Sequence, residues 1–326
     1  VQEAVLSSRI EGTQADLGQV LSFEAGQARV PEHAQADIRE ILNYRRALNE
    51  AERELQRRPF TLNLIRGMHA TLLDNVRGAN QARGEFRRVQ NWIGPEGADL
   101  ATAYFIPPEP NQLPGLLGSW EGYYHQSAPD ALVQLALLHA QFEFLHPFID
   151  GNGRIGRLLI PLYLYEKKLL SRPAFYLSEY LEAHRAEYYG HLRALGREPH
   201  AWLAWCRFFI TAVATQADGN SRKVQHILDL YGEYKAKAIE LTRSPFAVPV
   251  LDGIFEHVFF STSQLLARPG MPTRAALLSL LKRLTNAGML EVVEPAKGPR
   301  PLLAVCPELY ALCEGKEPQP SRSGAA

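Results

Sequence analysis

Apolar residues recur every three or four positions over most of the first two thirds of the chain, which is the spacing of helices that bury one face. The pattern predicts helices over residues 37–55, 62–73, 113–124, 131–145, 158–169, 181–195 and 202–214. Between residues 84 and 110, glycine, proline and aromatic residues replace this pattern and predict a short β-hairpin or loop, called the flap segment below. Residues 1–216 are therefore predicted to be mainly α-helical.

The pattern changes near the C-terminus. It predicts a helix over residues 248–259, a short helix capped by Ser261 or Thr262, and a helix from Thr273 to Gly288. Short strands over residues 290–293 and 302–305 follow. Helix, helix, turn, helix and a two-stranded wing is the order of a winged helix-turn-helix.

These patterns divide the chain into five parts. We expect an N-terminal segment at 1–30, a helical catalytic domain at 31–216, a helical linker at 217–247, a winged helix-turn-helix at 248–314 and a disordered tail at 315–326. The tail is low in hydrophobic residues, which is typical of disorder.

Composition narrows the classes of function. Of the 326 residues, 35 are Lys or Arg and 35 are Asp or Glu, so the chain as a whole does not attract nucleic acid or an anionic membrane. No apolar run reaches the roughly 18 residues of a membrane span, and the charged start is not a secretory signal. The first residue is not Met, so a trimmed start is expected. Cys206, Cys306 and Cys313 are too few and too widely spaced for a disulfide framework, and a cytoplasmic protein is expected.

Residues 146–157, HPFIDGNGRIGR, combine features that suit phosphate chemistry. Pro147 ends the preceding helix, so the imidazole of His146 lies at a helix terminus. Gly151 and Gly153 allow a tight loop whose N–H groups can point at an anion. The helix that follows presents the positive end of its dipole to the same place.

Three charged side chains complete this segment. Arg154 and Arg157 are three residues apart and share a helix face, and Asp150 offers an oxygen ligand suited to Mg²⁺. The segment lacks the Gly-Lys-Ser/Thr of a Walker A loop. It predicts a proton acceptor, a phosphate cradle, two guanidinium groups and a metal carboxylate in one site.

The segment resembles the Fic family signature, His-x-Phe-x-Asp/Glu-Gly-Asn-Gly-Arg-x-x-Arg, at every fixed position, and the resemblance covers residues 1–214. It implies an all-helical Fic fold with a small β-hairpin flap. It also implies an enzyme that uses ATP and Mg²⁺ to transfer AMP to a Tyr, Thr or Ser hydroxyl of a protein target. The motif leaves open the transfer of another group, such as UMP, phosphate or phosphocholine.

The resemblance also implies roles for individual residues. His146 is the expected general base, and Asp150 is the expected Mg²⁺ ligand. Charge on the phosphates is expected to be stabilised by Gly151, Asn152, Gly153, Arg154 and Arg157, with Arg157 on the γ-phosphate.

Two further elements resemble parts of the family's site. Arg88, Asn91, Trp92, Ile93 and Gly94 resemble the flap that aligns the target by strand addition, although Trp92 alone fits a core aromatic equally well. The stretch Glu187-Tyr188-Tyr189 resembles an element of the adenine pocket, with Tyr189 as the candidate residue. An ordinary tyrosine of an amphipathic helix is the alternative.

The stretch Ser7-Ser8-Arg9-Ile10-Glu11-Gly12 resembles the family's inhibitory motif, Ser/Thr-x-x-x-Glu-Gly/Asn, in the class that carries it on the N-terminal side. Ser7 and Glu11 are four residues apart and share a helix face, which alone would be typical of a solvated helix. The resemblance implies that Glu11 pairs with Arg157 and blocks the productive pose of ATP. A second hypothesis is that Glu11 positions water to remove AMP.

The C-terminal region carries a local positive charge. Residues 261–305 contain six basic and two acidic residues, a balance of +4. Arg274, Lys297 and Arg300 are therefore candidates for phosphate contacts with DNA. Contact with protein, including a homodimer, is the alternative, and a transcriptional regulator with a nucleotide-sensing Fic domain is the rival function.

Overall fold

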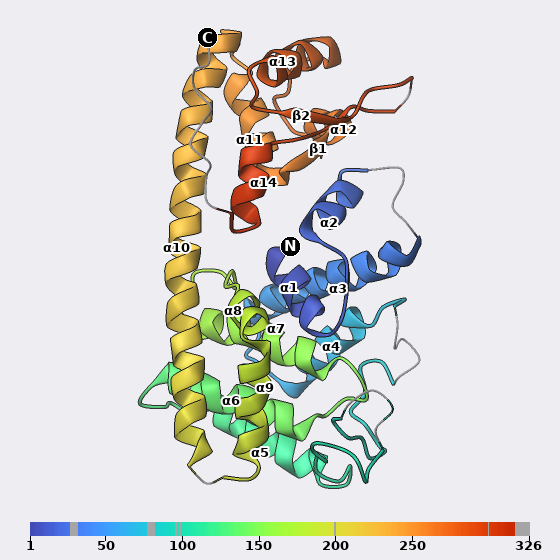
Figure 1. Cartoon of the computed structure of the whole chain (residues 1–326), viewed down its shortest axis with the longest axis vertical. Coiled ribbons are helices and arrows are strands. Elements are labelled where there is room, and N and C mark those ends of the chain that lie inside the picture. Colours follow the sequence, from blue (N-terminus) through green and yellow to red (C-terminus); the bar gives the residue numbers. More distant parts are fainter. Residues whose placement is uncertain are drawn as a thin grey trace. The chain divides into compact units, whose positions relative to one another are not determined.

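The computed structural model describes residues 1–26, 32–76, 82–94, 97, 99–198, 200–298 and 300–316. These residues form a mainly helical protein with one small three-stranded sheet (Figure 1). The chain divides into two compact units. The first comprises Val1, Glu3–Gln14 and Ala36–Asp218, and the second comprises Gln2, Ala15–Gln35 and Gly219–Ala326. No helix within the described ranges is both long enough and apolar enough to cross a membrane.

The first unit is built from helices. They are α1 (Gln2–Ile10), α3 (Glu32–Leu55), α4 (Leu62–Leu72), α5 (Leu113–His125), α6 (Ala131–Leu145), α7 (Asn152–Glu166), α8 (Ser178–Ala183), α9 (Arg185–Leu195) and the first part of α10 (Ala201–Thr242). Helix α6 is central: Trp120 of α5 and Trp205 of α10 each donate an indole N–H to one of its backbone carbonyls, both at 2.9 Å. The buried rings thus satisfy their polar atoms while packing against α6.

The capping residues explain where the central helices begin and end. Asp130 caps the start of α6, and its carboxylate accepts the N–H groups of Leu132 and Val133. Helix α6 ends at His146, which adopts a left-handed conformation with φ of 43°. Helix α7 begins at Asn152, six residues before the helix predicted from periodicity. Both arginines of the 146–157 segment therefore lie inside α7.

The flap segment contains less β-structure than predicted. Its described residues form one isolated bridge, between Ile93 and Phe105, in place of a hairpin of paired strands. Pro107 and Pro108 cannot donate backbone hydrogen bonds, so the ladder cannot continue past this bridge.

The second unit contains the sheet and the remaining helices. They are α2 (Leu17–Glu24), the second part of α10, α11 (Ala247–His257), β1 (Phe259–Ser261), α12 (Thr262–Leu266), α13 (Arg274–Asn286), β2 (Glu291–Glu294), β3 (Leu303–Val305) and α14 (Pro307–Cys313). The strands pair antiparallel in the order β1-β3-β2. Strand β1 was not predicted: α11 ends at Val258, whose φ is 64°, and the buried Phe260 then pairs with Ala304.

The division of the chain differs from the predicted one in two places. Helix α10 runs without a break across the expected boundary between residues 216 and 217. Residues 15–35 group with the second unit, where Gln264 donates to the carbonyl of Glu24 at 3.0 Å. Most of the predicted disordered tail, residues 317–326, lies outside the described residues.

The cap of α6 provides a test of the fold. Asp130→Ala removes the acceptor of two N–H groups, so we expect the free energy of unfolding to fall by about 1 kcal/mol in denaturant titrations. Asp130→Asn retains a capping oxygen and should stay within a few tenths of a kcal/mol of the wild type. Equal losses in the two variants would mean that the cap is not what stabilises the start of α6.

Candidate active site

The loop between α6 and α7 is closed by the side chain of Asn152. Its Oδ1 accepts the N–H of Phe148 at 2.8 Å, and its Nδ2 donates to the carbonyl of Phe148 at 2.9 Å. Gly151, with φ of 78°, makes the left-handed turn into α7. Both polar groups of the Asn152 side chain are thus used within the loop, so this residue fixes the shape of the loop. We call the first N–H groups of α7, which a helix leaves without internal partners, the cradle.

His69 of α4 supports the same loop and was missed by the sequence analysis. Its Nδ1 accepts the N–H of Gly84 at 2.9 Å, so its Nε2 carries the proton and donates to the carbonyl of Asp150 at 3.0 Å. Its ring stacks on Phe148 with 3.8 Å between centroids. Burial lowers the pKa of His69 to about 4, so the ring is neutral at pH 7 and accepts at Nδ1 while it donates at Nε2.

His146 is arranged as a proton acceptor. Its Nδ1 lies 3.3 Å from the carbonyl oxygen of Glu143, which can only accept, so Nδ1 carries the proton and Nε2 keeps its lone pair. Burial lowers the pKa of His146 to about 4, so the ring is neutral at pH 7. The backbone carbonyl of His146 accepts from Arg87 at 3.0 Å and from Asn91 at 3.3 Å. These contacts hold the residue in its left-handed conformation.

Arg154 is buried in an ion pair with Glu40 of α3. The Nη1–Oε2 distance is 3.1 Å, and the two side chains are only 6% and 7% exposed. Arg154 also lies 3.7 Å from Asp150, whose side chain is 47% exposed. The periodic pattern gave no signal for Glu40, since the pair joins residues 114 positions apart. Arg154 thus fixes the loop, and Asp150 remains accessible to a ligand.

Arg157 is held by the N-terminal segment. Its Nε donates to Ser7 Oγ at 2.8 Å, and its Nη2 donates to the Ser7 carbonyl at 3.0 Å and to Glu11 Oε1 at 2.6 Å. The Arg157 side chain is 1% exposed. The structure thus brings together the two residues of the predicted inhibitory motif and the last arginine of the 146–157 segment.

Glu11 lies over the first turn of α7. A Cβ placed on Gly153 would overlap Glu11 Oε1, so the carboxylate occupies the space in front of the cradle. Burial alone would raise the pKa of Glu11, but the charge and hydrogen bond of Arg157, assisted by Arg154 and His146, hold this pKa below its ordinary value. Glu11 is therefore ionised at neutral pH and acts as an anion at the anion-binding end of α7.

Two tyrosines of α9 lie beside this cluster. Tyr189 is half-buried, and burial with the nearby charge of Glu11 raises its pKa to about 12. Tyr188 is fully buried, and its hydroxyl lies 2.9 Å from Nε2 of His139. Because Nδ1 of His139 lies 3.2 Å from the carbonyl of Gly156 and must donate to it, Nε2 accepts from Tyr188. Tyr188 thus supports α7, and Tyr189 is the tyrosine near Glu11.

The flap residues have distinct positions. Asn91 donates to the carbonyls of His146 and Phe148, which ties the flap segment to the loop. Ile93 forms the single bridge, while Gly94 is exposed. Trp92 is 40% exposed, which excludes the core-aromatic alternative.

Glu143 is a further buried acid that the sequence analysis missed. Its Oε1 has no hydrogen-bond partner and packs so closely on Gly156 that a Cβ there would overlap it. Burial raises its pKa to about 7; the charge of Arg157 opposes this rise, and that of Glu11 adds to it. Its position three residues before His146 was the available signal, since that places it in the last turn of α6, next to His146.

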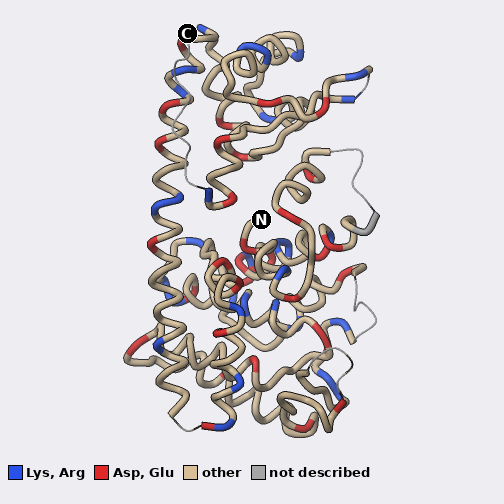
Figure 2. Tube along the Cα trace, viewed as in Figure 1, with Lys and Arg blue, Asp and Glu red and all other residues tan. Residues whose placement is uncertain are grey.

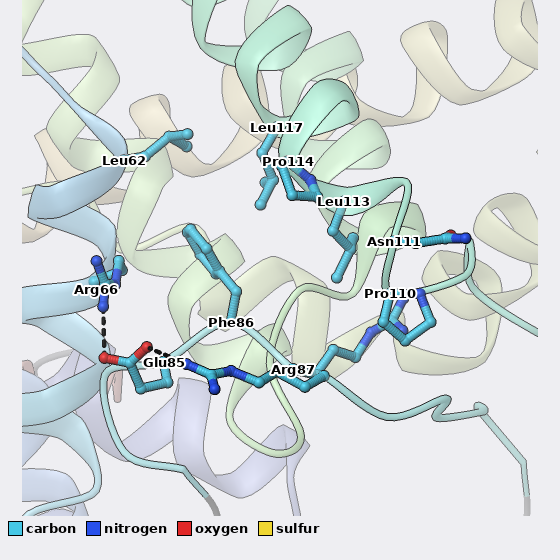
Figure 3. A pocket seen from close by; sticks show the side chains of 11 residues that line it. Leu62, Arg66, Glu85, Phe86, Arg87, Pro110, Asn111, Leu113, Pro114 and Leu117 are labelled. Carbon is cyan, nitrogen blue, oxygen red and sulfur yellow. Dashed lines mark hydrogen bonds and ion pairs between the residues drawn. The ribbon is translucent and has the colours of Figure 1, made fainter.

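A pocket of about 560 Å³ lies at the base of the flap segment (Figure 3). Leu62, Phe86, Leu113 and Leu117 form its apolar wall, and an ion pair between Arg66 and Glu85, at 2.5 Å, lies at its rim. None of residues 146–157 lines it. This pocket is therefore separate from the phosphate cradle, where Glu11 occupies the space.

Two stretches of the chain match one protein family. Residues 59–164 match the Fic/DOC family, and residues 1–53 match its N-terminal region. The matched stretches include residues 146–157, the flap segment, Ser7 and Glu11, but not Tyr189.

Curated relatives of the chain are adenylyltransferases by name. "Protein adenylyltransferase Fic" of Drosophila grimshawi is 31% identical over 155 residues, which cover 46% of this chain and 30% of the relative. The protein of the same name from Culex quinquefasciatus is 28% identical over 198 residues, which cover 59% of this chain and 36% of the relative. The chain thus spans about a third of the length of the curated relatives that it matches.

Solved structures share the fold. A Fic family protein from Desulfovibrio desulfuricans G20 has a TM-score of 0.57 and 18% identity, and the match covers 93% of this chain and 86% of that one. Fic-1 from C. elegans has a TM-score of 0.52 and 20% identity, over 69% of this chain and 62% of that one. At these identities the likeness concerns the fold alone.

The environment of His146 predicts its titration. Because its pKa is lowered to about 4, the imidazole should stay neutral from pH 8 down to about pH 5, and its contribution to stability should be lost as the pH falls from 6.5 towards 4. NMR titration of the histidine side chains checks this, with His146→Ala assigning the signal. A midpoint near 6.5 would contradict the buried, neutral arrangement.

Proposed function

We propose that the protein is an adenylyltransferase that transfers AMP from ATP to a Tyr, Thr or Ser hydroxyl of a protein target. The observation that carries this proposal is the neutral His146, with Nε2 free to accept a proton, on the loop that leads into the α7 phosphate cradle. The names of the curated relatives support the same activity.

The reaction follows from these positions. Nε2 of His146 takes the proton of the target hydroxyl, and the oxygen attacks the α-phosphorus of ATP. The bond from the α-phosphorus to the bridging oxygen of the β-phosphate breaks, and pyrophosphate leaves with the bonding electrons. The N–H groups of the first turn of α7 and the guanidinium groups of Arg154 and Arg157 stabilise charge on the phosphates. Tyr189, which lies near Glu11, is proposed to line the adenine side of this site.

The residues at the cradle fit Mg²⁺ held jointly with the nucleotide. No group of three or more His, Cys, Asp or Glu side chains that could hold a metal by itself occurs in the described part of the chain. Asp150 offers an accessible carboxylate, and Mg²⁺ is commonly bound by one or two carboxylates together with substrate phosphates. When bound, Mg²⁺ would neutralise phosphate charge beside Asp150.

Glu11 is proposed to keep this enzyme inactive. Its carboxylate occupies the front of the cradle and pairs with Arg157, the guanidinium that the γ-phosphate requires. An anionic phosphate cannot take the same place, since it would meet a like charge and lose its partner. The position of Glu11 beside the cradle also fits the second hypothesis, in which it orients water to remove AMP.

Removal of the Glu11 carboxylate is the direct test. We expect Glu11→Gly to raise AMP transfer from α-labelled ATP at least tenfold over the wild type, because Arg157 and the cradle become available. Mass spectrometry for an AMP adduct on the protein itself measures the product. Glu11→Gly combined with His146→Ala should transfer AMP at least a hundredfold more slowly than Glu11→Gly alone, because the proton acceptor is absent.

Arg9→Ala is the matched control, because Arg9 lies on α1 and its side chain is exposed. It should leave transfer unchanged. Equal transfer by wild type and Glu11→Gly, with ATP binding intact, would contradict autoinhibition. Labelling of the protein from UTP but not from ATP would show that UMP, and not AMP, is the transferred group.

We further propose that residues 248–314 form a winged helix-turn-helix that contacts DNA. The antiparallel order β1-β3-β2, with α11, α12 and α13 before the β2–β3 wing, supports this fold. Basic residues lie at the tip of the wing, where Lys297 and Arg300 occur (Figure 2). Arg268 and Arg283 are already engaged, with Glu256 and with the carbonyl of Thr242 respectively.

Binding to a DNA duplex tests this second proposal. Affinity should fall with rising salt, and Lys297→Ala combined with Arg300→Ala should reduce the salt slope by about two, one for each lost phosphate contact. Lys237→Ala with Lys235→Ala, on α10, is the matched control. No salt-dependent binding, together with a dimer that persists in sedimentation, would assign this region to protein contact.

A cytoplasmic location belongs to the same proposal. Three free thiols, Cys206, Cys306 and Cys313, agree with a reducing compartment.

A further inference from the structure

One face of α1 carries three polar residues at intervals of four. They are Glu3, Ser7 and Glu11, and the last two bind Arg157 as described above. Glu3 lies at the other end of the helix, outside the inhibitory motif, yet it is only 5% exposed. A carboxyl group is rarely buried without a specific set of partners, so this position requires an explanation.

The partners of Glu3 come from two other helices of the first unit. Its Oε1 accepts from Ser178 Oγ at 2.5 Å and from Tyr44 Oη at 3.2 Å, and its Oε2 accepts the N–H of Ser178 at 3.1 Å. Tyr44 belongs to α3, and Ser178 is the first residue of α8; both are fully buried. Glu3 therefore joins α1 to both helices and satisfies an N–H that the start of α8 leaves unpaired.

We propose that Glu3 is the anchor of the inhibitory helix: Glu11 restrains Arg157 only while the Glu3 carboxyl is seated between Tyr44 and Ser178. This inference rests on the autoinhibition proposed above. Helix α1 has nine residues, too few to hold its own shape, so its place depends on contacts with the rest of the unit. Glu3 supplies those contacts at one end, while Ser7 and Glu11 supply them at the other.

The anchor is sensitive to pH. Burial raises the pKa of Glu3 to about 7; the hydrogen bonds from Ser178 and Tyr44 and the charge of Arg157 oppose this rise. The docked helix thus holds the proton more tightly than an undocked one, whose carboxyl has an ordinary pKa of 4.5. Docking is strongest below pH 4.5, and this contribution is lost as the pH rises to about 7.

The charged and hydrogen-bonding groups that act on Glu3 come from three other helices. They are Tyr44 of α3 and Arg157 of α7, with the Ser178 hydroxyl and N–H from α8. The pKa of Tyr44 is raised well above 10 by burial and by Glu3 itself, so Tyr44 stays a donor over the whole range. Glu143 titrates in the same window, so only a comparison between variants at Glu3 isolates the anchor.

Transfer activity separates an anchor from a merely structural residue. Glu3→Ala should raise AMP transfer at least fivefold in the wild-type background and should add nothing in the Glu11→Gly background, where no restraint remains. Arg9→Ala, on the same helix, should change neither. A fall in activity in both backgrounds would overturn the proposal, because it would assign Glu3 to stability alone.

Hydrogen exchange of residues 2–11 tests docking without any activity. Between pH 5 and 7, protection of these amides in the wild type, relative to Glu3→Gln at the same pH, should fall by up to about tenfold per pH unit and then level off above pH 7.5. Glu3→Gln cannot ionise, and comparison at equal pH cancels the intrinsic exchange chemistry. A constant ratio across this range would overturn the proposal.

The two measurements distinguish the possible failures. If Glu11→Gly transfers no AMP but protection of α1 follows the expected course, the proposed function fails and the anchor stands. Should Glu3→Ala fail to fold, Ser178→Ala removes only the hydroxyl donor and should loosen α1 in the same direction, by several-fold in protection. Unchanged protection in a folded Ser178→Ala protein would contradict the anchor.

Discussion

The structure of the first unit depends on the buried guanidinium of Arg157 and on the groups that pair with it. A cation that is 1% exposed requires an anionic or hydrogen-bonding partner, because leaving it unpaired costs several kcal/mol. In this structure Ser7 and Glu11 are the partners, and in the proposed reaction the γ-phosphate replaces Glu11. The same physical requirement thus makes two states of the site mutually exclusive. In this proposal, inhibition requires only a carboxylate on a helix that docks beside α7.

The loop between α6 and α7 has to be rigid for this exchange to work. Side chains hydrogen-bond to its buried backbone groups. Asn152 binds both the N–H and the carbonyl of Phe148, His69 donates to the carbonyl of Asp150, and Arg87 donates to the carbonyl of His146. Arg154, paired with Glu40, fixes the first turn of α7 from the α3 side. These contacts position His146 and the first turn of α7 without using Glu11.

Sequence alone predicted most of the helices and the chemical groups of the 146–157 segment. Helices such as α4 and α6 follow directly from apolar spacing and their capping residues, and the 146–157 segment contains its histidine, glycines, acid and arginines within twelve positions. Local sequence patterns do not predict an element that has too few residues to show a period. Strand β1 has three residues and follows a helix that ends in an unusual conformation at Val258, so periodicity could not separate the two.

Local patterns thus determined which residues could carry phosphate chemistry, since helix spacing, turn glycines and proline act over only a few residues. The tertiary structure alone decided which of them meet. The pairs Arg154–Glu40 and Glu3–Ser178 join residues more than a hundred positions apart, and no periodicity encodes such a distance. Burial also changed their chemistry: the same environment that lowers the pKa of His146 raises the pKa of Glu3 and of Glu143. Desolvation depends on all the helices that surround a group, and so it exists only in the folded unit.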